Sequence, residues 1–203
     1  VEAMGGRGSV VVGTASSKYE NILENINIAY EAGADVALNV PPFYHKLPQE
    51  IIYDFYMRLA DDSKLPIMLY NMPDLTKNNI DLNTIEKLRT NNNIVGIKDS
   101  SGNLTYFQQL LCNYMSDEFS VFMGRAPLAL LAIILGASGT MTPIPNLNPE
   151  IEGSLYKLVK EGDIEKAKRN IMKVQQIVKL YASTPNPISS TVKGIISQLG
   201  LCK

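Results

Sequence analysis

Two residues able to do nucleophilic and acid–base chemistry lie at the ends of apolar segments. Lys98 follows the apolar run of residues 94–97, and Tyr70 is the last residue of the segment 66–70. Apolar runs of this length are typical of strands in a parallel sheet, which are buried on both faces. A lysine at the end of such a strand is partly dehydrated, which disfavours the charged form and makes the amine a nucleophile toward a carbonyl carbon. A lysine that simply extends into solvent is the alternative that this segment alone leaves open.

The spacing of Tyr70 and Lys98 favours the interpretation of Lys98 as a nucleophile over that of a lysine that extends into solvent. They end consecutive predicted strands, and neighbouring strands of a sheet lie roughly 5 Å apart, so the phenol and the amine are expected to share one pocket. A phenol beside an amine that attacks a carbonyl is a plausible proton shuttle. Gly96 shares a face with Lys98 and is expected to leave space beside it.

Short apolar runs alternate with longer segments of helical periodicity along nearly the whole chain. Strands are predicted at about 10–14, 36–40, 66–70, 94–98, 119–123 and 138–142. Helices are predicted at about 18–32, 49–60, 82–89, 104–114, 128–135, 149–160, 164–180 and 188–199. Six strands, each followed by a helix, predict an α/β fold with a parallel sheet. The sheet could be open or closed into a barrel, and in a barrel the catalytic groups lie at the carboxyl ends of the strands.

Composition excludes several classes of function. The 203 residues carry a net charge of −1 with no basic block, which argues against nucleic acid or an anionic membrane as a partner. Cys112 and Cys202 are isolated, so we expect no disulfide framework, no metal site and a reducing, cytoplasmic location. The single histidine, His45, excludes multi-histidine metal sites. Residues 12–17 form no glycine-rich phosphate loop, and the apolar stretch 126–137 is too short to span a bilayer.

Two motifs carry a resemblance to a known family. Residues 69–73 (LYNMP) and 96–103 (GIKDSSGN) resemble the signature regions of the dihydrodipicolinate synthase and N-acetylneuraminate lyase family. Shorter segments agree in order and spacing, at 12–14, 40–44, 135–139 and 186–187. These proteins are class I, pyruvate-dependent aldolases and lyases on a (β/α)8 TIM barrel. The resemblance implies a single domain, with about six βα units of the barrel in residues 1–147 and the last barrel helix plus a helical extension in 148–203.

The resemblance also implies roles for individual residues. Lys98 would form a Schiff base with the keto carbon of pyruvate or a 2-keto acid, and Tyr70 would relay protons. No metal or organic cofactor is expected, because the lysine imine itself serves as the electron sink. Other family positions fall on Gly124 and the backbone of Met141 (keto-acid site), Ser100 (substrate chain) and Tyr44 (reaching a neighbouring subunit). Tyr44 as a locally packed aromatic is equally open, and a homo-oligomer, dimer or tetramer, is expected.

Two departures from the family pattern bear on the substrate. The synthases carry an arginine two residues past the proline of the tyrosine motif, where it holds a carboxylate of the aldehyde; here Leu75 stands at that position. The acidic pair of sialic acid lyases is also missing after Gly124, where Arg125 stands either as a partner for a substrate anion or as a solvated loop residue. These features favour an aldehyde lyase that cleaves a 2-keto-3-deoxy sugar acid to pyruvate and an aldehyde. The alternatives are 4-hydroxy-tetrahydrodipicolinate synthase and a non-catalytic keto-acid-binding paralogue.

A further departure concerns the ends of the chain. Family members have two more strand–helix units before the position of Val1, and the second carries a Gly-Thr-Thr-Gly-Glu loop that binds the pyruvate carboxylate. This motif occurs nowhere in the sequence, and members usually continue beyond the position of Lys203. Six strands cannot close an eight-stranded barrel. We therefore expect this chain to be part of a longer protein, with a shortened, inactive paralogue as the alternative.

Overall fold

The structure is a computed structural model that describes residues 1–185 and 187–201. Contacts within the chain divide it into two units, Val1–Val121 and Phe122–Lys203, which are described separately. Asn186, in one of the segments that carry the resemblance, and Cys202 lie outside the described residues. Among the described residues, no helix combines the length and the apolar character needed to cross a membrane.

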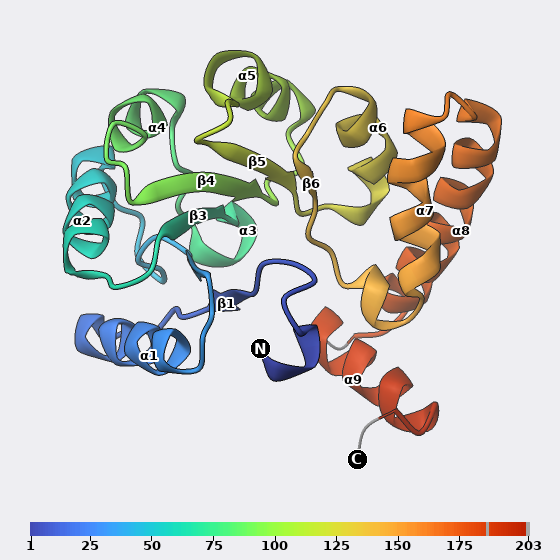
Figure 1. The fold of residues 1–203 in the computed structure, drawn as a ribbon, viewed down its shortest axis with the longest axis horizontal. Helices are drawn as coiled ribbons and strands as arrows, with labels where there is room; N and C mark the ends of the chain where they lie inside the picture. The colour runs from blue at the N-terminus through green and yellow to red at the C-terminus, as the bar shows by residue number, and fades with distance from the viewer. Residues whose placement is uncertain (186, 202–203) are drawn as a thin grey trace. The chain divides into compact units, whose positions relative to one another are not determined.

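The first unit is built on parallel strands with helices between them. Its strands are β1 (Val11–Gly13), β2 (Val36–Asn39), β3 (Ile67–Asn71) and β4 (Ile94–Asp99), adjacent in chain order. The helices are η1 (Glu2–Met4), α1 (Tyr19–Glu31), α2 (Gln49–Asp62), α3 (Pro73–Thr76), α4 (Leu82–Leu88) and α5 (Leu104–Tyr114). Figure 1 shows α2, α4 and α5 covering the outer face of β3 and β4. Their apolar faces supply the core, for example Ile52, Ile85 and Phe107, each with no exposed surface.

Strand register sets which side chains lie side by side. In β3 and β4, Tyr70 pairs with Lys98 and Asn71 with Asp99. Because successive residues of a strand point to opposite faces, the first pair shares one face and the second pair shares the other. The register thus places two chemically different pairs back to back at the carboxyl ends of these strands.

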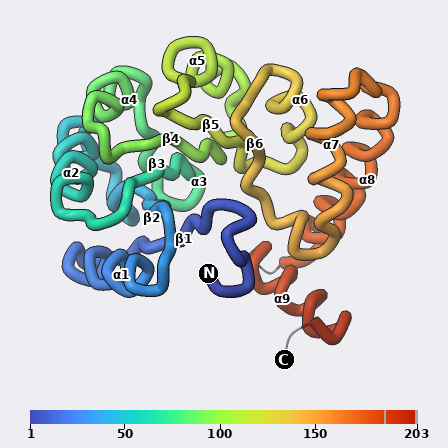
Figure 2. The backbone as a smooth tube through the Cα atoms, viewed as in Figure 1, coloured from blue at the N-terminus to red at the C-terminus, as the bar shows by residue number. Residues whose placement is uncertain are grey.

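The second unit is mainly helical. Strand β5 (Ser120–Met123) crosses the boundary between the units, and its last residues pair in parallel with β6 (Gly139–Thr140). The helices are η2 (Ala126–Leu128), α6 (Ala129–Ile134), η3 (Ile144–Asn146), α7 (Pro149–Lys160), α8 (Ile164–Ala182) and α9 (Ile188–Gln198). The backbone tube shows α7 and α8 side by side (Figure 2), where Leu155, Leu158 and Ala167 pack against α6. Asn148 and Asp163 cap α7 and α8 through their side-chain oxygens.

The parallel strands and intervening helices confirm the predicted fold class, part of a (β/α)8 barrel. Helix α5 has the predicted bounds, since Asn103 caps its start by accepting from the Tyr106 amide at 3.1 Å. Helix α3 was not predicted, because one short turn has no measurable periodicity. Strand β6 is shorter than predicted, although the Met141 amide after it still donates to the carbonyl of Met123. The division of the chain at residue 147 stays a prediction.

The expectation that Gly96 leaves open space beside Lys98 is wrong. A Cβ atom built on Gly96 would collide with the backbone carbonyl of Ser120, at the start of β5. The space beside this glycine is therefore filled by the next strand rather than left open beside Lys98. The physical reason for glycine here is the close approach of two backbones.

Candidate active site

Lys98 and Tyr70 come together at the carboxyl ends of β4 and β3. The Lys98 Nζ atom lies over the Tyr70 ring, 4.1 Å from its centroid, and both residues are partly buried. A protonated amine in this position is attracted by the electron-rich face of the ring. The proximity of amine and phenol expected from the sequence is therefore present in the geometry.

A buried polar network lies on the other face of the same strands. The Asn71 Nδ2 atom donates to Asp99 Oδ1 at 2.9 Å and to Asn79 Oδ1 at 3.0 Å. Asp99 also accepts from the amide and the hydroxyl of Ser101, at 3.1 and 3.0 Å. Sequence reasoning missed this network, although two polar side chains at the ends of apolar strands were a detectable signal.

The other predicted residues of the first unit differ in exposure. Ser100 is buried, 1% exposed, and its amide donates to the carbonyl of Asn71 at 2.8 Å. Tyr44 is 82% exposed with a φ of 86°, a left-handed conformation that is uncommon outside glycine. Its ring meets the edge of His45, with centroids 4.9 Å apart. Tyr44 is thus largely presented to solvent and makes one local ring contact, with His45.

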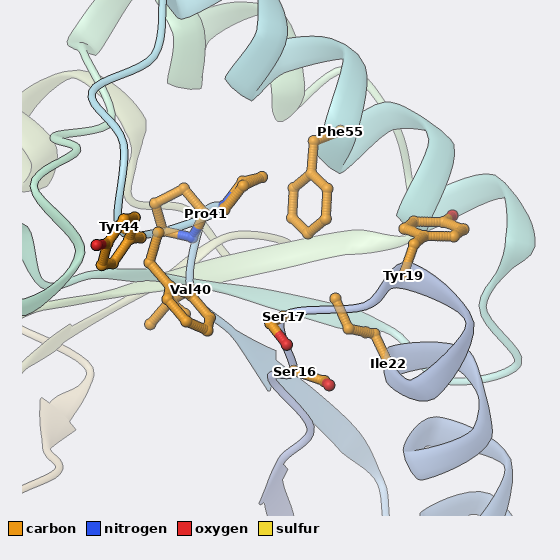
Figure 3. A pocket seen from close by; sticks show the side chains of 10 residues that line it. Ser16, Ser17, Tyr19, Ile22, Val40, Pro41, Tyr44 and Phe55 are labelled. Carbon is orange, nitrogen blue, oxygen red and sulfur yellow. The ribbon is translucent and has the colours of Figure 1, made fainter.

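A cavity of about 370 Å³ lies between the loops that follow β1 and β2. Figure 3 shows Phe55 and Ile22 facing the space, with Tyr44 and Pro41 on one side and Tyr19 on the other. Neither Lys98 nor Tyr70 is among its lining residues. The cavity is therefore separate from the amine–phenol pair.

The predicted residues of the second unit follow its two strands. Gly124 comes directly after β5, and Arg125 is a partly buried residue at the N-terminus of η2. The Met141 amide donates to the carbonyl of Met123 at 2.9 Å, which extends the β5–β6 ladder by one bond. These three residues thus lie where strands end, and their roles stay predictions.

Glu152, on α7, is a buried acidic residue that sequence reasoning missed. It is 3% exposed, and its carboxylate accepts hydrogen bonds from the hydroxyls of Thr142 and Thr140. Burial raises the pKa of the Glu152 carboxyl, and the two hydroxyls only partly offset this effect. Burial, together with the charge of Glu152, also raises the pKa of Tyr181 to about 12. The sequence pattern of α7 gave no sign of this burial, because a single glutamate in an amphipathic helix is usually exposed to solvent.

Parallel strand–helix units with a lysine and a tyrosine in contact at strand ends are the arrangement of a barrel lyase of the aldolase class. The chain belongs to the dihydrodipicolinate synthetase family, whose profile matches residues 1–203. Members of this family are lyases of the aldolase type.

Curated relatives and solved structures agree with this assignment. The 4-hydroxy-tetrahydrodipicolinate synthase of Methanoculleus marisnigri is 30% identical over 99% of this chain and 68% of its own length. That of Microcystis aeruginosa is 33% identical over 98% and 66%. The dihydrodipicolinate synthase of Bacteroides thetaiotaomicron has a TM-score of 0.90 at 32% identity, covering 100% of this chain and 69% of that one. The chain thus spans about two thirds of the length of these relatives.

Proposed function

We propose that Lys98 forms a Schiff base with the keto carbon of pyruvate and that Tyr70 moves protons for this chemistry. The observation that carries the proposal is the contact of the Lys98 amine with the Tyr70 ring at the ends of neighbouring strands. A related synthase, from Acinetobacter baumannii, is described as a complex with pyruvate, at 28% identity and a TM-score of 0.88 over 100% of this chain and 68% of its own. The proposed activity is therefore a pyruvate-dependent carbon–carbon lyase or synthase.

The chemistry follows from the properties of an iminium ion. The free amine of Lys98 attacks the keto carbon, and the oxygen leaves as water after accepting protons, which we propose that Tyr70 carries. The iminium then accepts an electron pair, so that loss of a proton from the methyl carbon of pyruvate yields an enamine. That enamine attacks an aldehyde carbon and forms a carbon–carbon bond; cleavage is the reverse. Hydrolysis of the product imine returns the amine.

Two observations disagree about the aldehyde. The curated relatives are named 4-hydroxy-tetrahydrodipicolinate synthase, so aspartate semialdehyde is the first candidate and the sugar-acid cleavage favoured by the sequence becomes the second. Leu75 supports the second candidate: its side chain, on α3, is 73% exposed and offers no charge to a carboxylate. The identity of the aldehyde is thus decided by turnover rather than by homology.

The remaining predicted residues keep proposed roles. Gly124 and the Met141 backbone would line the keto-acid site, while Ser100 and Arg125 would contact the more distant part of the substrate. Exposed Tyr44 would reach a second copy of the chain in a homo-oligomer. A monomeric variant of a related synthase has been solved at 25% identity and a TM-score of 0.90, covering 100% of this chain and 68% of its own, so the oligomeric state needs direct measurement.

The decisive experiment is borohydride reduction of the full-length protein in the presence of pyruvate, followed by peptide mass spectrometry. We expect one reduced adduct, on Lys98, and none in Lys98→Arg, because the guanidinium stays protonated and is not a nucleophile. Lys64→Arg is the matched control, since Lys64 also lies over a tyrosine ring, that of Tyr30, at 5.5 Å. A folded protein without an adduct on Lys98 would exclude both enzyme candidates and leave the keto-acid-binding alternative.

Once the adduct is established, a panel of aldehydes separates the two enzymes. Turnover with pyruvate and aspartate semialdehyde would establish the synthase despite Leu75. Turnover restricted to neutral hydroxyaldehydes would establish the sugar-acid lyase. Gel filtration of the same sample reports the oligomeric state.

A further inference from the structure

Asn71 and Asp99 are buried polar residues for which the proposed chemistry assigns no role. Neither side chain has any exposed surface, and they lie opposite each other in the β3–β4 register. Each immediately follows a proposed catalytic residue, Asn71 after Tyr70 and Asp99 after Lys98. Burial of a carboxylate is costly unless it is well hydrogen-bonded, so such a pair is expected to have a specific arrangement.

The hydrogen bonds of the pair are nearly complete and reach beyond the two strands. Asn71 donates to Asp99 and to Asn79, and its Oδ1 accepts from the Ile80 amide at 3.1 Å. The backbone continues the connection, because the Ser100 amide donates to the carbonyl of Asn71 at 2.8 Å. One side chain therefore links the end of β3 to the end of β4 and to the segment that precedes α4.

The register that this link joins also sets which side chains meet on the opposite face of the sheet. A shift of one strand by one residue would invert the faces of that strand, so that Tyr70 and Lys98 would lie on opposite faces of the sheet. The β3–β4 ladder contains a register shift between Ile67 and Met68, so the pairing at the start of the two strands does not by itself fix the pairing at their carboxyl ends. The side-chain bond from Asn71 to Asp99 at 2.9 Å is satisfied only when the two residues lie opposite each other, as they do.

We infer that Asn71 and Asp99 are positioning residues that hold the Lys98 amine over the Tyr70 ring. This role rests on the proposed Schiff-base function. The pair acts through hydrogen bonds across the strands and touches neither pyruvate nor the aldehyde. Misplacement of reacting groups by about 1 Å can cost on the order of 100-fold in rate, so loss of the link is expected to affect imine formation beyond its effect on stability.

Asn93 offers a matched control at the other end of the same strands. It immediately precedes β4, and its Nδ2 atom donates to the carbonyl of Ala60 at 2.7 Å. Its backbone carbonyl accepts from the Ile67 amide at 2.7 Å, so it also joins β4 to β3. An alanine at position 93 removes side-chain hydrogen bonds of a similar kind at the end of β4 opposite to Lys98.

The test compares Asn71→Ala, Asp99→Ala, Asp99→Asn and Asn93→Ala in the full-length protein, at equal folded fraction. Asparagine at 99 keeps an oxygen for Asn71 and a polar group for Ser101. We expect trapping of pyruvate on Lys98 by borohydride to slow about 100-fold in the two variants Asn71→Ala and Asp99→Ala. We expect Asp99→Asn to restore most of the rate, and Asn93→Ala to lower the melting temperature without slowing the trapping.

A second readout separates this inference from the proposed function. Trace acetylation by acetic anhydride measures the reactivity of Lys98 relative to exposed Lys64 without any keto acid. We expect Asn71→Ala to change this ratio severalfold and Asn93→Ala to leave it unchanged. If the wild type forms no pyruvate adduct, the proposed function fails, and the acetylation ratio alone decides the positioning role.

Three results would overturn the inference. The first is equal slowing of pyruvate trapping in Asn71→Ala and Asn93→Ala. The second is a ratio of Lys98 to Lys64 acetylation that is the same in Asn71→Ala and Asn93→Ala as in the wild type. The third is equal loss in Asp99→Asn and Asp99→Ala, which would assign the effect to charge. If the Asn71→Ala and Asp99→Ala variants fail to fold, Ser101→Ala replaces them. This variant removes one hydrogen-bond donor to Asp99 at a partly buried position. Trapping of pyruvate in Ser101→Ala as fast as in Asn93→Ala would overturn the inference.

Discussion

At the scale of single residues, the contact between Lys98 and Tyr70 carries the functional argument. The amine lies over the face of the ring, so the aromatic surface holds the amine in place while the hydroxyl stays available for proton transfer. Placement of the Lys98 amine and proton relay are therefore separable, because placement needs the ring of Tyr70 and proton relay needs its hydroxyl oxygen.

Replacing Tyr70 by phenylalanine tests this separation. The ring remains, so the final extent of pyruvate trapping on Lys98 is expected to stay near the wild-type level, although it is reached more slowly. Turnover is expected to fall about 100-fold, since a positioned acid–base group typically contributes at least that much. Steady-state kinetics together with borohydride trapping measure the two effects. Tyr30→Phe, which alters the corresponding surface pair with Lys64, should change neither, and equal loss of trapping and turnover in Tyr70→Phe would contradict a relay.

At the scale of elements, Gly96 sets how closely β4 approaches the start of β5. The Ser120 carbonyl occupies the volume that a Cβ atom would need. Any side chain at this position pushes the strands apart two residues before Lys98.

Gly96→Ala is therefore expected to lower the free energy of unfolding by about 1–3 kcal/mol, the usual cost of an overpacked core site. Urea unfolding followed by circular dichroism measures the change. Gly13→Ala in β1 is the matched control, because its Cβ would meet no atom within 4 Å. A Gly96→Ala variant as stable as Gly13→Ala would show that the close approach is not maintained in solution.

At the scale of the whole molecule, buried Glu152 makes stability depend on pH. Its pKa is raised in the folded state above its ordinary value of 4.5. The folded state therefore binds this proton more tightly than the unfolded state, and the stabilisation that protonation brings is lost as the pH rises through the folded pKa.

Glu152→Gln removes this dependence while keeping a group that can bond to Thr142. We expect its melting temperature to exceed that of the wild type by about 2–4 °C at pH 7, as for ~1 kcal/mol in a protein of this size, with the difference vanishing near pH 4. Differential scanning calorimetry across this range measures both. Glu150→Gln changes the same charge at an exposed position of α7 and should not raise the melting temperature; a pH-independent difference in Glu152→Gln would refute the burial argument.

Much of the fold was predictable, because the signals are local. Apolar runs and helical periodicity reflect burial of one face of each element, and this holds whatever the element packs against. The α/β class, the strands around Tyr70 and Lys98, and the bounds of α5 follow from such patterns. The proximity of phenol and amine was predictable too, since consecutive strands with a helix between them are usually neighbours.

The amino-acid sequence by itself thus determined the order of strands and helices, the family, and the pair of residues proposed for catalysis. Only the tertiary structure decided that Gly96 admits the Ser120 carbonyl, that Asn71 binds Asp99, and that Glu152 is buried under two threonine hydroxyls. Each of these contacts joins residues at least ten positions apart, and which atoms meet depends on register and on the packing of elements. Local periodicity carries no information about either.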